Sequence, residues 1–176
     1  AESGAFPIFC PTTHGIGGKP MNTNYLSKLN VDWGIGTDCS GGNDDYDMFE
    51  EMRTALVLNN SVAQDNFIKP KDIFRKASEE NISRISGGVF SGTLSKNQKA
   101  DFITISTNTP RMQPLHDVIN NIVMCASSKE VKDVYIDGEC IVKDSKFQNI
   151  DEEIILEEGT NAINTLFTKT GFDKKI

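Results

Sequence analysis

The first half of the chain alternates short apolar runs with segments of helical periodicity. The apolar runs at residues 6–11 and 31–38 predict two strands, each of which ends in polar or glycine-rich sequence. Helices are predicted over residues 22–29, from residue 48 to about 60, and from residue 70 to about 84. Strand, helix, strand and helix in succession are typical of parallel α/β structure.

Residues suited to the ends of helices support these assignments. Asn22 or Thr23 fits the N-cap of the first helix, and Asp45 or Asp47 fits that of the second. Pro70 fits the first position of the third helix, because the N–H group that proline lacks has no partner there. Four apolar residues of the second helix recur at helical spacing and are predicted to face the core, namely Met48, Met52, Ala55 and Leu56. The charged residues between them are predicted to form a solvated or ion-paired face, namely Glu50, Glu51 and Arg53.

The pattern changes after the pair Gly87-Gly88, and we predict a boundary near residues 85–92. Residues 100–106 predict a strand, and residues 131–143 predict a β-hairpin whose turn is Asp137-Gly138.

Two further apolar segments lie in the second half. Residues 118–125 fit either a helix or a strand, because so short an apolar run does not separate the two. Residues 151–167 predict an amphipathic helix that ends the chain.

The composition excludes several classes of protein. Hydrophobic residues make up 38% of the 176 residues, enough for a packed core. The net charge is −7 and no basic cluster occurs, so nucleic acid is excluded as the main partner. No run of about 18 apolar residues occurs, so no membrane-spanning segment is predicted. The four cysteines form no Cys-x-x-Cys pair and favour a reducing, cytoplasmic location. The N-terminus lacks an initiator Met and the features of a signal peptide, and it reads as though the chain were entered partway through.

Three segments in unbroken order, from about Phe9 to Lys143, resemble one enzyme family. They are Cys10-Pro-Thr-Thr-His14, then Gly36-Thr-Asp38 with Asn43-Asp-Asp-Tyr-Asp-Met-Phe-Glu-Glu-Met-Arg53, then Ser91-Gly-Thr-Leu94 with Lys99-Ala-Asp-Phe102 and Val131 to Lys143. Together they are similar to the amidohydrolase superfamily, in the branch that contains triazine chlorohydrolases, guanine deaminase and adenosine-type deaminases.

The resemblance implies a fold and a reaction. Residues 1–88 would form strands seven and eight of a (β/α)8 TIM barrel with their helices, and residues 89–176 the C-terminal part of a composite β-sandwich plus a terminal helix. The complete enzyme would be a hydrolase that cleaves a C–N bond (deamination) or a C–Cl bond of a nitrogen heterocycle. It would use hydroxide bound to one divalent metal ion, zinc or iron, because such a metal lowers the pKa of its water toward about 7.

Three residues carry the implied site. Asp38 would be a metal ligand and the catalytic proton acceptor, since chemistry in these barrels lies at the C-terminal ends of strands. Read from the residues alone, Asp38 could instead be a loop aspartate bonded to nearby backbone N–H groups. His14 and Asn43 would lie on the substrate side, although His14 could be an exposed residue of a flexible glycine-rich loop at residues 14–19. That loop lacks the GxxxxGK[ST] spacing of a phosphate loop.

The chain departs from the family pattern in its histidines. The family takes a His-x-His pair from strand one, a third His from strand five and usually a catalytic His from strand six, whereas only His14 and His116 occur here. A barrel needs about 250 residues, so we expect the first six strands to be absent and the chain alone to be inactive. Phe9, His14 and Gly42 replace residues that are common in the branch (His, Asn and Ser), which leaves the substrate open.

Three hypotheses follow about the state of the chain. It could be the C-terminal fragment of a complete deaminase or chlorohydrolase, one half of a split enzyme completed in trans, or a non-catalytic interaction module. The first two imply the N-terminal half of the barrel as a partner, from the same gene or a second chain, and a small heterocyclic substrate. A homo-oligomer is expected for the complete enzyme.

Overall fold

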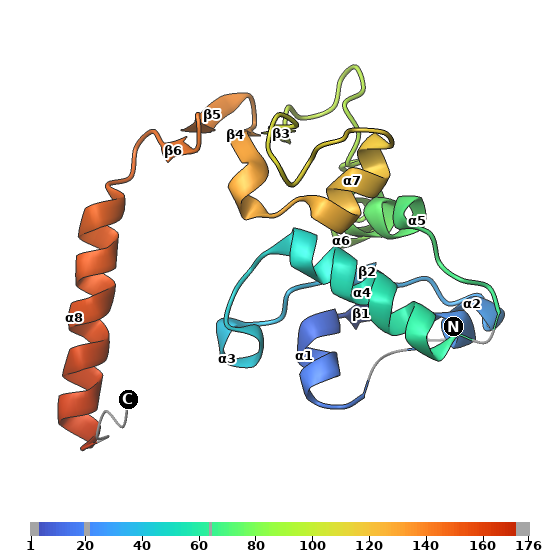
Figure 1. Ribbon diagram of the computed structural model, residues 1–176, viewed down its shortest axis with the longest axis horizontal. Coiled ribbons are helices and arrows are strands. Elements are labelled where there is room, and N and C mark those ends of the chain that lie inside the picture. Colours follow the sequence, from blue (N-terminus) through green and yellow to red (C-terminus); the bar gives the residue numbers. More distant parts are fainter. Residues whose placement is uncertain (1–3, 20–21, 64, 172–176) are drawn as a thin grey trace.

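The computed structural model describes residues 4–19, 22–63 and 65–171, and begins with a pair of short parallel strands (Figure 1). In β1 (Ile8–Phe9) and β2 (Gly34–Ile35), Ile8 lies opposite Gly34 and Phe9 opposite Ile35. The predicted strands are present but shorter than the apolar runs. The outer edge of β2 meets a side chain instead of a strand, because Asn81 bonds both the N–H and the carbonyl of Ile35.

Helices follow both strands and cover them. Their bounds are α1 (Pro11–Ile16), α2 (Thr23–Lys28), α3 (Ser40–Asn43), α4 (Met48–Val62), α5 (Pro70–Arg75) and α6 (Asn81–Ile85), with a π-helical turn at Lys76–Glu80 joining the last two. The predicted caps are confirmed for two of them: the side chain of Asn22 accepts from the N–H of Tyr25, and that of Asp47 accepts from the N–H of Phe49. Pro70 is the first residue of α5, as predicted.

The prediction of a loop at residues 14–19 is wrong for its first half. His14 lies inside α1, where its N–H donates to the carbonyl of Cys10 over 2.9 Å. Pro11 starts this helix with a backbone angle already suited to it, and the glycines Gly17 and Gly18 end it. The polar, glycine-rich sequence after the second predicted strand likewise contains one helical turn, α3.

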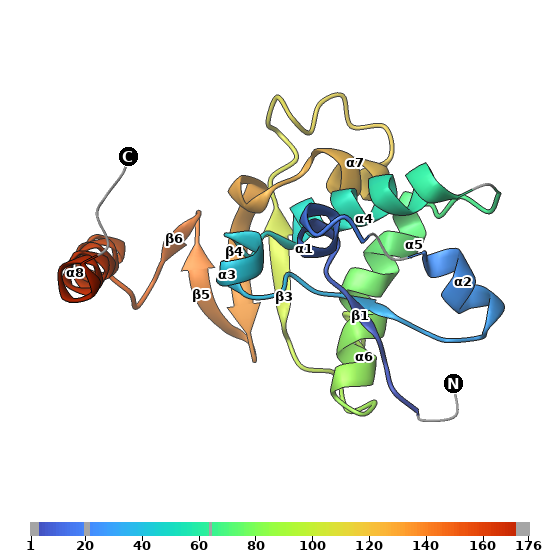
Figure 2. The ribbon, with the colours of Figure 1, turned by 90° about the horizontal axis from the view of Figure 1, so that it is seen from below.

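The second half contains an antiparallel sheet of four strands in the order β3-β4-β5-β6 (Figure 2). In chain order, the second half consists of β3 (Phe102–Ile105), α7 (Val118–Cys125), a 3-10 turn at Ser128–Glu130, β4 (Val131–Ile136), β5 (Glu139–Lys143), β6 (Lys146–Phe147) and α8 (Glu152–Thr170). The predicted hairpin is confirmed, with Asp137 and Gly138 at its turn and both at positive φ. The segment at 118–125, which fitted a helix or a strand, is a helix.

One hydrophobic core joins the two halves. It contains Phe9, Trp33 and Met52 from the first half and Met112 and Val123 from the second. The helix α7 packs against α4 and α5, and Arg53 ties them further by donating to the carbonyls of Met124 (2.8 Å) and Ala126 (2.6 Å). The core therefore crosses the predicted boundary, and the division into residues 1–88 and 89–176 stays a prediction.

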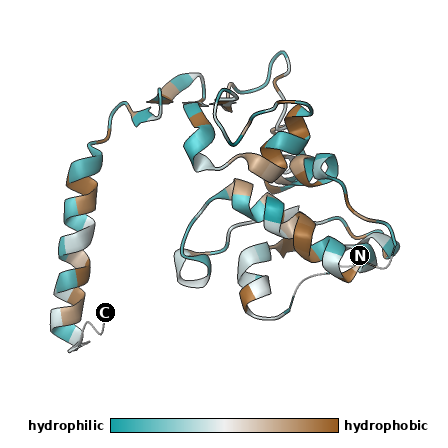
Figure 3. Ribbon diagram, viewed as in Figure 1, coloured by the Kyte–Doolittle hydropathy of each residue, from teal (hydrophilic) through white to brown (hydrophobic). Residues whose placement is uncertain are grey.

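The helix α8 stands apart from this core (Figure 1). No residue of it is buried, and its apolar residues Ile155, Ile163 and Leu166 are 57%, 41% and 52% exposed. The apolar residues of α8 colour mostly the side of its ribbon that faces the rest of the molecule (Figure 3). Neither α8 nor any other helix in the described ranges is long and apolar enough to cross a membrane. The prediction about a signal peptide rests partly on residues 1–3, which lie outside the described residues.

Candidate functional site

Asp38 lies just beyond the C-terminal end of β2, three residues after Ile35. Its side chain is exposed and its backbone is left-handed, with φ of 63°. One carboxylate oxygen, Oδ1, accepts from the N–H of Cys39 over 2.8 Å. The other, Oδ2, lies toward Gly42, 3.1 Å from where a Cβ on that residue would be. The position matches the one expected of a barrel ligand, and the bond to Cys39 matches the alternative of a loop aspartate; the ligand role stays a prediction.

The start of α1 lies beside Asp38, because parallel strands bring their C-terminal ends to the same edge. The hydroxyl of Thr13 lies 3.3 Å from the same Cβ position on Gly42, so it borders the same small space as the Asp38 carboxylate. The thiol of Cys10 is close as well: burial raises its pKa, and the negative charge of Asp38 raises it further.

Polar atoms of α1 near this edge are buried without a hydrogen bond to any part of the chain that the structure describes. They are Thr12 Oγ1, Thr13 Oγ1 and His14 Nδ1. The ring of His14 stacks on that of Phe9, with 5.4 Å between centroids. The ring of His14 is thus packed against Phe9. Its predicted role in binding substrate stays a prediction.

Asn43 connects two elements of the site instead of lying open. Its side chain is buried, and its Nδ2 donates to the carbonyl of Thr37 (2.9 Å) and to Oε1 of Glu51 (2.7 Å). The amide group therefore joins the loop after β2 to α4. A contact with substrate, which the resemblance implies, stays a prediction.

Glu51 does not lie where its neighbours in the sequence predict. It was predicted on a solvated or ion-paired face, but its exposed fraction is 0%. Its Oε2 accepts from the N–H of Thr12 over 3.1 Å, and its Oε1 accepts from Asn43. Glu50, the neighbouring residue, is exposed as predicted. The helical spacing contained one signal for this arrangement, since Glu51 lies four residues before the buried Ala55 on the same helix face.

The described residues do not form a metal site by themselves. They contain no group of three or more His, Cys, Asp and Glu side chains placed to hold an ion. Zinc takes about four protein or solvent ligands, and Asp38 alone offers one carboxylate. His116, the second histidine, is exposed in a distant loop, where its Nδ1 lies 3.2 Å from the carbonyl of Pro114. A metal centre at this edge therefore needs ligands that these residues do not supply.

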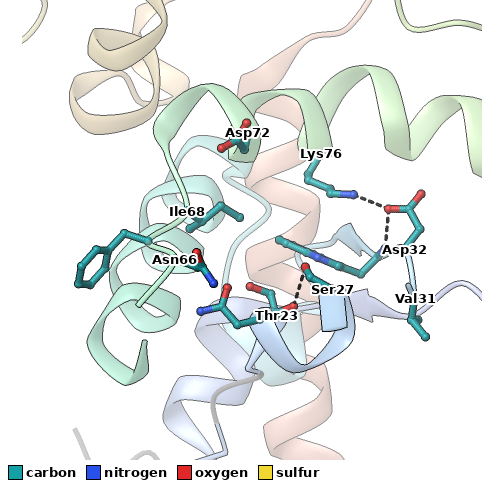
Figure 4. A pocket seen from close by; sticks show the side chains of 11 residues that line it. Thr23, Ser27, Val31, Asp32, Asn66, Ile68, Asp72 and Lys76 are labelled. Atoms are coloured by element: carbon teal, nitrogen blue, oxygen red, sulfur yellow. Dashed lines mark hydrogen bonds and ion pairs between the residues drawn. The ribbon is translucent and has the colours of Figure 1, made fainter. Parts of the chain in front are cut away.

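A pocket of about 390 Å³ lies at the opposite end of β2 (Figure 4). Asp32, Trp33 and Lys76 line it, and the Lys76 ammonium lies 5.3 Å from the Trp33 ring centroid. Lys76 also pairs with the carboxylates of Asp32 and Glu80. Because Asp32 and Trp33 precede β2 and Asp38 follows it, the pocket is separate from the candidate site.

Comparison with known proteins decides the family. The sequence model of the amidohydrolase family matches residues 21–141. This chain belongs to the amidohydrolase family. It is 32% identical over 146 residues to 5-methylthioadenosine/S-adenosylhomocysteine deaminases of Bacillus cereus and Bacillus thuringiensis, covering 82% of this chain and 34% of each relative. The chain thus spans about a third of the length of these relatives.

Solved structures show the same fold. An adenosine deaminase from Xanthomonas campestris with bound zinc is 25% identical, with a TM-score of 0.89, and is matched over 95% of this chain and 38% of its own. An atrazine chlorohydrolase from Arthrobacter aurescens, in complex with zinc, is 16% identical, with a TM-score of 0.81 and coverage of 91% and 36%. The family resemblance is confirmed, and with it a fold related to the TIM barrel. The relatives named are hydrolases, and the deaminases among them act on C–N bonds.

Proposed function

We propose that this sequence is the C-terminal part of a metal-dependent deaminase that hydrolyses a C–N bond of a nitrogen heterocycle. In this proposal residues 1–88 supply strands seven and eight of the barrel, and residues 89–176 complete a β-sandwich and end in a helix. The observation that carries it is the place of Asp38, at the C-terminal end of β2 and beside the parallel strand β1. Active sites of these barrels lie at that end.

The relatives favour deamination over dechlorination. The adenosine-type deaminases are 32% identical over most of the chain, whereas the chlorohydrolase is 16% identical. An adenine nucleoside, such as 5-methylthioadenosine or S-adenosylhomocysteine, is therefore the substrate class that we propose. The replacements at Phe9, His14 and Gly42 leave the group attached to the ribose open.

The proposed reaction requires proton transfer. Water adds to the ring carbon that bears the amino group, and ammonia leaves, so a proton must pass from the water to the leaving nitrogen. A carboxylate at the strand end can carry it. Asp38 is suited to this task because it is exposed and its Oδ1 is fixed by the N–H of Cys39.

A zinc or iron ion is part of the proposal, with Asp38 as one ligand. Since the described residues supply no further ligands, the others would come from the part of the relatives that this sequence does not span. That part is also the proposed partner, either in the same polypeptide or as a second chain. Two features support such a partner. Within the described residues the parallel sheet has two strands, β1 and β2, and the apolar side of α8 is uncovered.

The test replaces Asp38 in the complete polypeptide that carries this sequence. We expect Asp38→Asn to reduce ammonia release from adenine nucleosides by about 10²–10⁴-fold, the usual contribution of a proton-transfer group, and to lower the zinc or iron content measured by mass spectrometry. Asp44→Asn is the matched control, because Asp44 is exposed on the same segment between β2 and α4 and asparagine tolerates its left-handed backbone. Full activity and metal content in Asp38→Asn would remove Asp38 from the site.

Native mass spectrometry of the purified protein separates the forms of the partner. One polypeptide well above 19.4 kDa that carries a metal supports a single chain, and a complex of two different polypeptides supports a split enzyme. A particle of 19.4 kDa, or a multiple of it, that turns over an adenine nucleoside contradicts the proposal, because this part alone is expected to be inactive.

A further inference from the structure

The buried carboxylate of Glu51 lies where the two strand ends of the candidate site meet α4. It accepts from the N–H of Thr12, in the first turn of α1, and from the side chain of Asn43, at the end of α3. Thr12 follows β1 and Asn43 follows β2, and the separation along the chain from Glu51 is 39 and 8 residues. One side chain thus bonds both segments that follow the parallel strands.

The contact continues to the residue beside Asp38. Asn43 Nδ2 donates to Glu51 and also to the carbonyl of Thr37, over 2.7 and 2.9 Å. Thr37 precedes Asp38 directly, and Asp38 has a left-handed backbone that a non-glycine residue adopts only where its surroundings hold it. The path from Glu51 through Asn43 to Thr37 supplies such a restraint on the side that faces the core.

The cost of burying a charge argues that Glu51 is placed there for a reason. A carboxylate with 0% exposure loses its hydration, which is offset only by good hydrogen bonds or a counterion. The ion pairs of the described residues do not include Glu51, and N–H donors from α1 and α3 take the place of a cation. An apolar residue at this place in the helix would pack against the core without that cost, but it would bond neither segment.

We infer that Glu51 is a positioning residue, which acts through Asn43 and Thr37 to fix the loop that carries Asp38 against the segment after β1. The inference rests on the proposed function for the role of Asp38, while the bridge itself is independent of the reaction. Glu51 itself bonds neither substrate nor metal in this proposal.

The first test compares Glu51→Gln with Glu50→Gln in the complete polypeptide. Glutamine keeps the shape, but it presents an NH2 group to one of two donors and leaves that donor without an acceptor. Glu50 is the adjacent, exposed carboxylate of the same helix, so its replacement removes the same charge without breaking the bridge. We expect Glu51→Gln to lower kcat about 10-fold or more with KM nearly unchanged, and Glu50→Gln to leave both at the parent values.

Hydrogen exchange supplies a readout that does not need activity. The amides of Gly42 and Asn43 bond the carbonyl of Cys39, and that of His14 bonds the carbonyl of Cys10. In Glu51→Gln we expect the peptides that contain residues 10–16 and 37–44 to exchange several-fold faster, both together, with no change in Glu50→Gln. Unchanged exchange in both peptides overturns the bridge. If Asp38→Asn keeps full activity and metal content while Glu51→Gln shows faster exchange, the proposed function is overturned and the bridge stays in place.

A double variant separates positioning from folding alone. Asn43→Asp with Glu51→Gln restores a hydrogen bond between the two side chains with donor and acceptor exchanged, but the carboxylate introduced by Asn43→Asp donates nothing to the carbonyl of Thr37. We expect the thermal midpoint to recover by more than half of its loss, while kcat stays low. Recovery of kcat in step with the midpoint overturns the positioning role, and so does a single variant that is less stable but fully active.

Discussion

The helices α4 and α8 begin in the same way and end in different environments. Asp47 and Asp151 cap them, and each carboxylate accepts from the N–H groups of the second and third residues that follow it. Both helices carry acidic residues in the first turn and apolar residues at helical spacing. Yet α4 buries six side chains, and α8 buries none.

The difference shows which property each part of the sequence encodes. Caps and periodicity determine that a helix forms and which side of it is apolar, but the element that covers that side lies elsewhere. For α4 it consists of α1, α5, α7 and β2. For α8 the Xanthomonas campestris structure gives a comparison. The match covers 95% of this chain, so it omits fewer residues than the 19 of α8, and it takes up 38% of that protein. We propose that the remaining part of the barrel covers α8.

The largest effect is expected where α4 meets the core. Met52 is 4% exposed, and Met52→Ala should reduce the free energy of unfolding by about 2–5 kcal/mol, through lost burial and the cavity left behind. Val57→Ala, on the same helix at a site 56% exposed, should change it by less than about 0.5 kcal/mol. Urea denaturation followed by circular dichroism measures both. Equal losses would mean that the packed side of α4 is assigned wrongly.

A variant of α8 turns the comparison into a test of its cover. In the complete polypeptide Ile155→Ala should cost about 2 kcal/mol if the apolar side is packed against the rest of the barrel. Glu157→Ala, on the opposite side of the helix, should cost less than about 0.5 kcal/mol. Denaturation midpoints at constant m-value report the difference. Small and equal changes in the two variants would show that α8 is uncovered in the complete protein as well.

The two caps offer a smaller contrast. Asp47→Ala should cost about 1–2 kcal/mol and Asp151→Ala about 0.5–1 kcal/mol. The loss of stability is larger for Asp47→Ala because Oδ2 of Asp47 also accepts from the N–H of Ser128 over 2.9 Å. This bond joins α4 to the segment before β4. Hydrogen exchange of the first turns and denaturation midpoints measure the losses. A larger loss of stability in Asp151→Ala than in Asp47→Ala would contradict this prediction.

Much of the fold follows from local signals in the sequence. The helix start at Pro70 and the turn at Asp137-Gly138 were placed correctly, and each cap was one of the two residues predicted for it, Asn22 and Asp47. Each of these features depends on neighbours a few residues away. The position of Asp38 at a strand end also emerged from the order of apolar and polar residues. Its role as a ligand did not, and it remains a prediction that the family resemblance supplied.

The parts that were missed depend on residues distant in the chain. Glu51 reads as a surface residue between Glu50 and Arg53, and only the approach of Thr12, 39 residues earlier, makes its burial favourable. The outer edge of β2 is likewise bonded by Asn81, 46 residues after Ile35. Periodicity cannot reveal such partners. It shows which side of a helix or strand is apolar, but it does not show which distant residues form hydrogen bonds with a polar residue on that side.

The smallest effect concerns an ion pair at the end of β2 opposite to Asp38. Burial would raise the pKa of the Asp32 carboxyl, but its hydrogen bond and ion pair with Lys76 hold it below the ordinary value of 3.8. The stability from this carboxyl is therefore fully present above pH 3.8 and is lost as the pH falls through the lower pKa of the folded state. Because the Asp32 side chain is 42% exposed, solvent screening limits the contribution to about 0–1 kcal/mol.

Urea midpoints from about pH 6 to about pH 2 should fall less in Asp32→Asn than in the parent, whereas Asp65→Asn, an exposed loop control, should follow the parent. Parallel curves for all three proteins would mean that the pair contributes nothing measurable.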